Sequence, residues 1–268
     1  MSLALASEFE FTALTRVDST LCEARRRLDS GNLTRPSLIL AQEQTAGRGR
    51  RGREWVSPPG NVYLTFCYPS PRPPAELAIL SLAAGLAWIE ALTPLAQYGL
   101  DPAALTLKWP NDLLYDGAKL AGILLEYAGI LLEYQVTAPG GWLLLGTGLN
   151  RSAHPPDTPY PATHLAAQLS ELPSCSELAQ RYGEAFMRAV MRWERSGNAA
   201  LCSAWLAKAA HRPGDPLVAR LAQESLSGRF VGLDAQGALQ LQLADGAVRR
   251  IQAADLFFAG QEPALAHG

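Results

Sequence analysis

A short segment rich in glycine and arginine carries the clearest chemical signal in the sequence. Three glycines and four arginines fill the seven positions from Gly47 to Arg53, and Trp55 follows them. The segment cannot pack as a regular element, because glycine loses the most backbone freedom on ordering and neighbouring guanidinium groups repel one another. An anion would order it, since successive N–H groups can converge on oxygen atoms and arginine adds bidentate hydrogen bonds. We therefore expect a loop that closes over a small negatively charged ligand, with the indole of Trp55 as an apolar cover.

Solvated tails and nonspecific nucleic-acid contacts have a similar composition, and they are the alternative interpretation of this segment. A tail, however, does not lie between two apolar runs such as residues 37–41 and 62–68. The formal net charge is −2, and the rest of the chain offers no extended basic surface that could follow a polyanion. We therefore favour a small ligand and expect no DNA binding.

A second group of polar residues follows the strand predicted at residues 105–108. Lys108, Asn111 and Asp112 flank a Trp-Pro pair, and the proline stops ladder pairing, so these side chains are expected at a strand end. An Asp-Gly pair then predicts a hairpin turn, after which the chain returns through Lys119. The hairpin should bring Lys119 back towards Asp112, although the sequence does not define the strand register.

Two shorter segments also carry residues suited to ligand binding. Asp18, Ser19 and Thr20 open a predicted helix, where hydroxyl and N–H groups either cap the helix or bind the polar atoms of a ligand. A glycine turn is predicted at residues 146–148, with Asn150 at the carboxyl end of its strand. Such small residues allow either a close backbone approach to a ligand or simply a tight turn.

The elements that position these residues follow from hydrophobic periodicity. Strands are predicted at residues 37–41, 61–68, 105–108 and 119–126, and a further strand begins at residue 142 and ends in the glycine turn at 146–148. Helices are predicted at residues 20–28, 75–98, 162–169, 176–195 and 199–209. From residue 211, short alternating runs separated by turns predict four or five strands of a small β-barrel. The boundary near residue 211 divides the chain into a domain at 1–210 and a smaller domain at 211–268.

One run of seven residues occurs twice in succession, at residues 121–127 and 128–134. Because seven is odd, a second copy in the same strand would turn its apolar side chains to the opposite face of the sheet. We expect the first copy to form a core strand and the second to lengthen an edge hairpin or to bulge from the sheet. The sequence does not indicate what the duplication does.

Composition is that of an ordinary globular protein with one sizeable core, since 48% of the 268 residues are hydrophobic and 18% are charged. The four cysteines lie far apart and away from the four histidines, so neither a disulfide framework nor a zinc site is indicated. The N-terminus lacks the basic start and apolar run of a signal peptide, and no stretch approaches about eighteen uninterrupted apolar residues. We therefore expect a cytoplasmic protein without a membrane partner.

Taken in order, the motifs resemble those of biotin protein ligases, the enzymes that attach biotin to carrier proteins. The resemblance covers essentially the whole chain, and its motifs are Asp18-Ser19-Thr20, the glycine and arginine segment, Lys108-Trp-Pro-Asn-Asp112, Lys119-Leu-Ala-Gly122 and Gly146-Thr-Gly-Leu-Asn150. It implies an α+β fold of the class II synthetase-like biotin/lipoate ligase type, with a central mixed sheet, flanking helices and a small C-terminal β-barrel.

The sequence departs from the family pattern in three places. Leu21 follows Thr20 where the family usually has asparagine, and the duplicated run has no counterpart. Seventeen residues precede Asp18, fewer than the N-terminal DNA-binding domain of the repressor type needs. A monofunctional enzyme is therefore expected.

The resemblance also implies the reaction and its partners. ATP and biotin would form biotinyl-5'-adenylate with the help of Mg²⁺, and a lysine of a biotin carboxyl carrier protein domain would then take the biotin. Biotin contacts are implied for Ser19, Thr20, Gln44, Gly47, Arg48, Trp55, Lys119 and Gly122. Nucleotide contacts are implied for Arg50, Arg53, Trp55, Asn111 and Asn150, magnesium binding for Asp112, and catalytic roles for Lys119, Arg50 and Arg48.

This chemistry has a physical rationale in the residues themselves. A carboxylate and a triphosphate must be brought together, and a cationic loop, a lysine and a metal ion offset their repulsion and the charge that develops at phosphorus. Holding both reactants in line contributes several kcal/mol more, on the order of known proximity effects. A closed loop would also keep water away from the adenylate.

Other functions remain open at this point. A lipoate or octanoate ligase or transferase of the same superfamily would share the sheet and a lysine, but the arginine segment and the terminal barrel favour biotin. A module that binds biotin without turning it over would not need Asp112 and Lys119. Whether a sheet edge pairs two copies into a homodimer is not indicated by the sequence.

Overall fold

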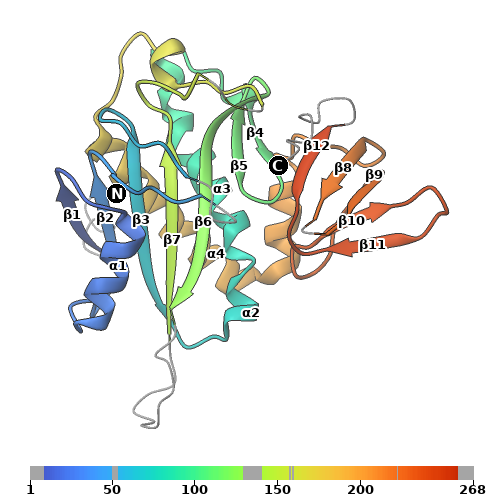
Figure 1. The fold of residues 1–268 in the computed structure, drawn as a ribbon, viewed down its shortest axis with the longest axis horizontal. Helices are drawn as coiled ribbons and strands as arrows, with labels where there is room; N and C mark the ends of the chain where they lie inside the picture. The colour runs from blue at the N-terminus through green and yellow to red at the C-terminus, as the bar shows by residue number, and fades with distance from the viewer. Residues whose placement is uncertain are drawn as a thin grey trace.

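The computed structural model describes residues 9–49, 54–128, 141–156, 158, 160–221 and 223–258. Over these residues the chain forms a large mixed sheet flanked by helices and a smaller sheet at its C-terminal end (Figure 1). The predicted fold class, α+β with a central mixed sheet and flanking helices, is confirmed.

The large sheet has seven strands in the order β1-β2-β3-β7-β6-β5-β4. They are β1 (Glu10–Leu14), β2 (Ser37–Ala41), β3 (Val62–Ser70), β4 (Leu105–Lys108), β5 (Asp112–Tyr115), β6 (Ala118–Ala128) and β7 (Gly141–Leu149). β1 pairs with β2 in parallel and the other neighbours are antiparallel. The central strands are apolar on both faces because helices cover the sheet on both sides. The sequence-based expectation omitted β1, which has no continuous apolar run.

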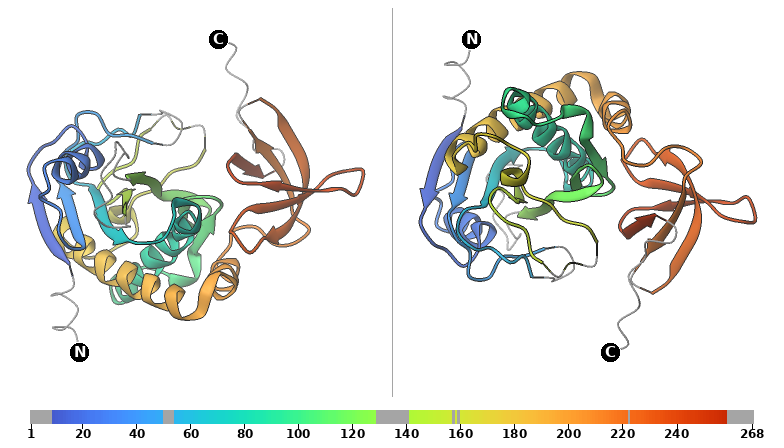
Figure 2. Two further views of the ribbon diagram at one scale, coloured as in Figure 1. Left: turned by 90° about the horizontal axis from the view of Figure 1, so that it is seen from below. Right: turned by 90° about the horizontal axis from the view of Figure 1, so that it is seen from above.

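The helices divide between the two faces of this sheet, as Figure 2 shows. α1 (Thr20–Asp29) packs through Leu21 and Ala24 on one face, and α3 (Leu80–Leu92) and α4 (Cys175–Leu206) lie on the other. The indole N–H of Trp88 in α3 donates a 2.8 Å hydrogen bond to the buried hydroxyl of Thr147 in β7. This bond fixes the helix layer to the centre of the sheet.

Two helix predictions differ from the structure, and the division of a third helical region is confirmed. The helix predicted at residues 75–98 is divided into α2 (Pro74–Leu77), α3 and the 3₁₀ helix η2 (Thr93–Tyr98), which begins where Pro94 cannot donate a helical hydrogen bond. The helix predicted at 162–169 is only the short η4 (Leu165–Ala167). The helices predicted at 176–195 and 199–209 both lie in α4, which is interrupted between them at Gly197, where φ is +73° and ψ is −177°, so this division is confirmed. A further 3₁₀ turn, η3 (Pro102–Ala104), precedes β4.

The smaller sheet is antiparallel and has five strands in the order β11-β10-β9-β8-β12. They are β8 (Pro216–Arg220), β9 (Ser225–Leu233), β10 (Leu239–Gln242), β11 (Val248–Ile251) and β12 (Asp255–Phe258). The predicted set of short strands is therefore present, but within the described residues β11 and β12 are the two edges, and closure into a barrel is not observed. The division of the chain near residue 211 stays a prediction.

Trp109 connects the two sheets. Its backbone N–H donates to Nε2 of His211 at 3.1 Å, and its indole N–H donates to the carbonyl of Gly237 at 3.0 Å. The His211 ring is buried among the rings of Trp205, Phe230 and Phe258. Because Trp109 directly follows β4, these contacts fix the small sheet beside the end of β4.

One described segment, Pro74–Tyr98, has the length and mean hydropathy (1.6) of a membrane span. The segment contains Glu76, Ser81 and Glu90, so it is not an uninterrupted apolar run and the expectation of no such run is not contradicted. In the structure 67% of its most apolar window is buried inside the protein, where α3 packs between the sheet and α4. This burial is that of a core helix.

The duplicated run is placed only in part. Its first copy lies in β6, paired with β5 and β7, which confirms the expected core strand. The second copy, residues 128–134, lies outside the described residues beyond Ala128. The predicted glycine turn was wrong, since Gly146 and Gly148 lie inside the continuous strand β7.

Candidate active site

A pocket lies on the α1 face of the large sheet and reaches strand β12 of the small sheet. The predicted site residues that line it are Ser19, Thr20, Gln44, Arg48, Trp55, Asn111, Asp112, Lys119 and Gly122. Gly47 and Asn150 lie beside the pocket without lining it, and Arg50 and Arg53 fall outside the described residues. The structure therefore brings together residues that are separated by more than a hundred positions in the chain.

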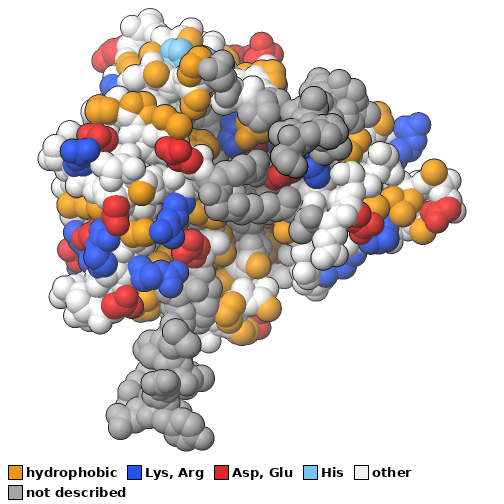
Figure 3. Space-filling view, viewed as in Figure 1, with side chains coloured by type: hydrophobic (Ala, Val, Ile, Leu, Met, Phe, Trp, Pro, Cys, Tyr) orange, Lys and Arg blue, Asp and Glu red, His pale blue; other side chains and the backbone are white. Residues whose placement is uncertain are grey.

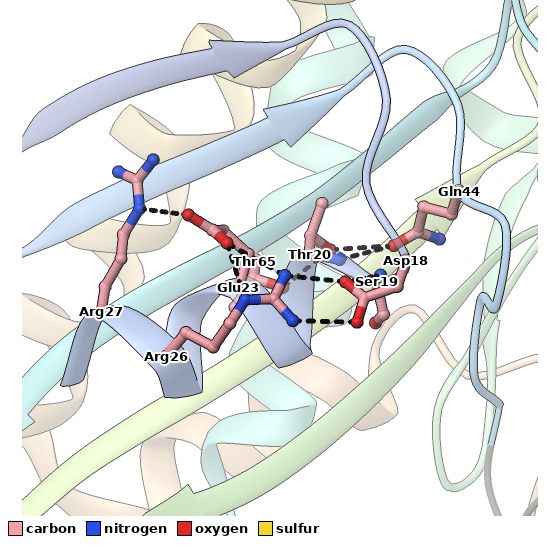
Figure 4. Close-up of polar contacts among 8 residues, drawn as sticks. All are labelled: Asp18, Ser19, Thr20, Glu23, Arg26, Arg27, Gln44 and Thr65. Carbon is pink, nitrogen blue, oxygen red and sulfur yellow. Dashed lines mark hydrogen bonds and ion pairs between the residues drawn. The ribbon is translucent and has the colours of Figure 1, made fainter. Parts of the chain in front are cut away.

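Thr20 and Gln44 form the polar end of the pocket (Figure 4). The Gln44 side-chain oxygen accepts from both the N–H of Thr20, at 2.8 Å, and its hydroxyl, at 3.1 Å. The buried hydroxyl of Thr65 donates to the Thr20 oxygen at 2.9 Å. Neither hydroxyl caps the helix, because Ser19 forms no side-chain cap and the Thr20 hydroxyl donates to Gln44. These groups can therefore offer fixed donors and acceptors to a neutral polar ligand.

Asp18 holds the chain that leads into this polar end. Its carboxylate accepts two hydrogen bonds from Arg26, at 2.8 and 2.9 Å, and one from the N–H of Ser19, at 2.7 Å (Figure 4). The Arg26 guanidinium lowers the pKa of Asp18 to about 2, and the Ser19 N–H acts in the same direction. Arg26 also bonds Glu23 at 3.1 Å, so the start of α1 is braced from outside the pocket.

Trp55 lies against glycine positions on the two strands beneath it. A Cβ added at Gly148 would lie 2.5 Å from the indole nitrogen, and one added at Gly122 would lie 3.0 Å from the ring. The backbone N–H of Trp55 donates to the carbonyl of Gly47 at 2.9 Å, so Gly47 helps to hold the tryptophan. Only glycine allows this close approach, so the small residues of β6 and β7 shape the pocket for the indole.

Lys119 and Asp112 form an ion pair inside the pocket, with 2.8 Å between Nζ and Oδ1 and side-chain exposures of 12% and 15%. Asp112 pairs with Gly122 across the β5–β6 hairpin, whereas Leu114 pairs with Lys119, so Leu120 is an extra residue in β6. A bulge of this kind turns the following side chains. It therefore lets Lys119 and Gly122, three residues apart, share the pocket with Asp112.

The charge of Lys119 is set by its surroundings. Burial lowers its pKa, but the Asp112 carboxylate and the hydrogen bond to Tyr160 outweigh this effect, so the net pKa is raised. The backbone N–H of Lys119 donates to the carbonyl of Pro161 at 2.8 Å, and the Lys119 carbonyl accepts from the backbone N–H of Thr163 at 2.9 Å. The loop that carries Tyr160 is therefore fixed beside the ammonium group, which stays protonated.

The two asparagines predicted to bind the nucleotide, Asn111 and Asn150, donate hydrogen bonds to backbone carbonyl groups. The Asn111 amide donates to the carbonyl of Ile123 at 2.7 Å, although the residue lines the pocket. Asn150 is buried and donates to Thr163 at 3.0 Å and to Lys119 at 3.5 Å. In this structure Asn150 supports the segment around Lys119, and its contact with a nucleotide stays a prediction.

Sequence reasoning missed the residues that close the far side of the pocket. Tyr160 comes from the proline-rich loop, and Asp255 and Phe257 come from β12. No spacing in the sequence connects these positions with the hairpin. The excess of prolines around Tyr160, which favours a fixed loop, was the one available signal.

Acidic and basic side chains are mixed over the described residues on the face drawn in Figure 3, without an extended patch of one sign. Among the residues that the structure describes, no group of three or more His, Cys, Asp or Glu side chains could hold a metal ion. The pocket instead combines neutral polar groups and the Trp55 indole with charged side chains of both signs. The carboxylates are Glu54, Asp112 and Asp255, and the cations are Arg48, Lys108 and Lys119. The fold and this site together suit the binding of a small ligand that carries neutral polar groups and a negative charge.

Comparisons with known proteins identify the class of this protein as that of the biotin and lipoate ligases. The model of the biotin/lipoate A/B protein ligase family matches residues 13–137, and that of the biotin protein ligase C terminal domain matches residues 218–258. A biotin--[acetyl-CoA-carboxylase] ligase from Paracoccus denitrificans is 38% identical over 92% of this chain and 100% of its own. The chain belongs to the biotin protein ligase family and is a ligase.

Further relatives support the assignment. The biotin--[acetyl-CoA-carboxylase] ligase of Mycobacterium tuberculosis is 32% identical over 74% of this chain and 70% of its own. The Aquifex aeolicus biotin protein ligase in complex with biotin and ATP superposes with a TM-score of 0.74 over 93% of this chain and 99% of its own, and at 24% identity it shows the fold. The Leishmania major ligase in complex with biotinyl-5-AMP is 26% identical over 91% of this chain and 99% of its own, with a TM-score of 0.60.

Proposed function

We propose that the chain uses ATP to convert biotin into biotinyl-5'-adenylate in this pocket and then transfers biotin to a lysine of a biotin carboxyl carrier protein domain. The observation that carries the proposal is the distance of 2.8 Å between Lys119 and Asp112 in the pocket that also holds the Thr20 and Gln44 cluster. A neutral polar end and a charged end in one pocket match a ligand with a polar ring system and a carboxylate. Family membership supplies the identity of that ligand.

Each end of the pocket has its own task in this proposal. Ser19, Thr20 and Gln44 hydrogen-bond the neutral ring system of biotin, and Trp55 covers it. Buried hydroxyl and amide groups discriminate strongly, because a ligand without the matching groups leaves them unpaired. Arg48 lines the same pocket and supports the carboxylate of biotin.

Lys119 acts at the reacting centre. A carboxylate oxygen of biotin attacks the α-phosphorus of ATP, the bond from that phosphorus to the bridging oxygen breaks, and pyrophosphate leaves with the electron pair. The fixed ammonium group of Lys119 offsets the repulsion between carboxylate and phosphate and the charge that develops on the phosphoryl oxygens. Removing a preorganised donor of this kind costs about 10²–10³ in rate.

Asp112 is the residue that would hold Mg²⁺. Its Oδ1 is buried and forms the ion pair with Lys119, but it accepts no further hydrogen bond from the described residues. It can therefore take a cation as a second partner. A single carboxylate suits Mg²⁺, which keeps several waters and is otherwise bound by substrate phosphates. When bound, the ion would screen the negative charge of the triphosphate.

The second half-reaction uses the same pocket. The neutral amine of the carrier lysine attacks the carbonyl carbon of the mixed anhydride, the C–O bond to phosphate breaks, and AMP leaves while the amine loses a proton. Trp55 lies over the strands at this point and limits the access of water to the anhydride. The predicted roles of Arg50 and Arg53 in enclosing the phosphates stay predictions.

A carrier domain provides the test. The purified protein, incubated with biotin, ATP, magnesium and a biotin carboxyl carrier protein domain, should add one biotinyl group to a single lysine of the carrier, as measured by mass spectrometry. An unmodified carrier would contradict the proposal. Lipoate in place of biotin should give no product, and a lipoylated carrier would instead favour the lipoate and octanoate alternative.

Two wider expectations belong to the same proposal. The first is a cytoplasmic location, which the four free cysteine thiols support because a reducing compartment disfavours disulfides. A homodimer stays a prediction, for which the edge strand β1 is the candidate surface. At the other edge, Leu107 of β4 already pairs with the backbone of Lys208 and Ala210. Light scattering during gel filtration measures the oligomeric state directly.

A further inference from the structure

Two of the three lysines in the chain line the pocket, whereas twenty of the 23 Lys and Arg residues are arginine. These two lysines are Lys108, at the end of β4, and Lys119. The third, Lys208, has an exposed side chain. A lysine presents a compact point charge with three donors, which suits phosphoryl oxygens that arrive from several directions.

The distances to three aromatic rings show where the two ammonium groups lie along the pocket. The Lys119 Nζ lies 5.4 Å from the ring centroid of Trp55 and 5.2 Å from that of Tyr160. The Lys108 Nζ lies 5.4 Å from Tyr160 and 5.4 Å from Phe257. Tyr160 is thus shared by both cations, while Lys119 lies on the side of Trp55 and Lys108 on the side of β12.

The two cations differ in their partners. Lys119 is paired with Asp112 at 2.8 Å. Lys108 forms none of the ion pairs found among the described residues. Burial lowers the pKa of Lys108, and the neighbouring Lys119 lowers it further, whereas Asp112 and Asp255 act in the opposite direction. An anion bound beside Lys108 would therefore gain a cation whose charge is only partly balanced.

We propose that Lys108 binds the pyrophosphate end of the nucleotide while biotinyl-adenylate forms. This inference rests on the proposed function and adds a residue to it. In an in-line displacement the leaving group departs on the side of phosphorus opposite the attacking oxygen. Lys119 is on the side of Trp55, whose carbonyl is joined through Ser57 to Gln44 at the biotin end. Lys108 is on the far side of Tyr160 and faces the departing oxygens.

The inference also gives the small sheet a part in the site. Phe257 and Asp255 of β12 lie beside Lys108, and Trp109, the residue after Lys108, is hydrogen-bonded to His211 and Gly237. The small sheet therefore holds Lys108 in place. Binding of the pyrophosphate end depends on both parts of the chain.

Titration calorimetry with magnesium pyrophosphate tests the inference on the full chain. Lys108→Gln should weaken pyrophosphate binding about tenfold, the usual size for the loss of one charge-assisted hydrogen bond. Lys108→Arg, which keeps the charge, should recover most of this affinity. Lys208→Gln is the matched control and should bind as the unmodified protein does. Biotin binding without nucleotide should change less than about twofold in all three variants.

Pyrophosphate affinity that is unchanged in Lys108→Gln would overturn the inference. An equal loss of biotin and pyrophosphate affinity would also overturn it, because Lys108 would then be supporting the pocket as a whole. A failure of the proposed function differs from a failure of this inference. In the first case the unmodified protein would leave the carrier without biotin. The pyrophosphate titration would still measure the effect of Lys108. If Lys108→Gln does not fold, the comparison of Lys108→Arg with the unmodified protein decides, and a loss of pyrophosphate binding there contradicts the role.

Discussion

The ammonium nitrogen of Lys119 lies 2.8 Å from a carboxylate oxygen of Asp112, across a hairpin whose register is shifted by one residue. Each group neutralises the charge of the other. A bound carboxylate or phosphate would compete with Asp112 for the ammonium group, and a cation would compete with Lys119 for the carboxylate. The pair therefore offers one position for an anionic substrate, at Lys119, and one for a cation, at Asp112.

Lys119→Ala should reduce the rate of adenylate formation by about 10²–10³, because a preorganised cation is lost from the reacting centre. The amplitude and rate of the pyrophosphate burst measure this directly. The matched control is Lys208→Ala, whose side chain is exposed and which should leave the burst unchanged. A burst of near-normal rate and amplitude in Lys119→Ala would remove this residue from the reaction.

Gly148→Ala should displace Trp55, because the added Cβ would lie 2.5 Å from the indole nitrogen and the strand backbone cannot move away. We expect biotin affinity to fall about tenfold, roughly the value of a buried aromatic contact, with the melting temperature little changed. In a Trp55→Ala background the same substitution should have almost no further effect. Equal effects of Gly148→Ala with and without Trp55 would show that the glycine serves another purpose.

Thr20→Val removes the hydroxyl that is held between Gln44 and Thr65. Biotin affinity should fall by about tenfold, since a charge-free but buried hydrogen-bonding group is lost at the polar end. Thr65→Val is the control, because Thr65 is buried behind Thr20 and does not line the pocket. Thr65→Val should lower the free energy of unfolding by about 1 kcal/mol, measured by denaturant unfolding. It should lower biotin affinity much less than Thr20→Val does. A larger effect on biotin from Thr65→Val than from Thr20→Val would contradict this order.

Much of the sheet and part of the site could be predicted from the sequence, because local signals define them. The apolar runs of β2, β3 and β7 and the Asp-Gly turn between β5 and β6 are such signals. The proximity of Lys119 and Asp112 follows from the hairpin alone. Their contact could not be predicted, because it depends on the extra residue Leu120 in β6.

Long-range contacts account for the remainder. Thr20 meets Gln44 because the segments after β1 and β2 run in parallel, with a bridge between Val17 and Gln44. The approach of β12 to the pocket depends on how the small sheet docks through Trp109. Neither relationship has a local sequence signal.

Stability should fall as the pH is lowered through the titration of His211. Burial lowers the pKa of His211 from 6.5 to about 4, with Lys108 adding to the effect, and the ring must be neutral at Nε2 to accept from Trp109. Above about pH 6.5 the ring is neutral in both states and full stability is present. Between about pH 6.5 and 4 only the unfolded chain takes up the proton, so the free energy of unfolding falls by up to about 3 kcal/mol.

Denaturant unfolding at a series of pH values measures this loss. His211→Gln keeps a side-chain acceptor for the Trp109 N–H but does not titrate, so its stability should depend less on pH in the same interval. An equally steep pH dependence in His211→Gln would assign the effect to other groups.

The central claim is that this pocket joins biotin to ATP. Exchange of labelled pyrophosphate into ATP tests it most directly, because exchange requires reversible adenylate formation and no carrier protein. The account predicts exchange by the unmodified protein in the presence of biotin, none with lipoate or without an acid, and a loss of about 10²–10³ in Lys119→Ala. Exchange that is equal with and without biotin, or no exchange at all, would contradict it.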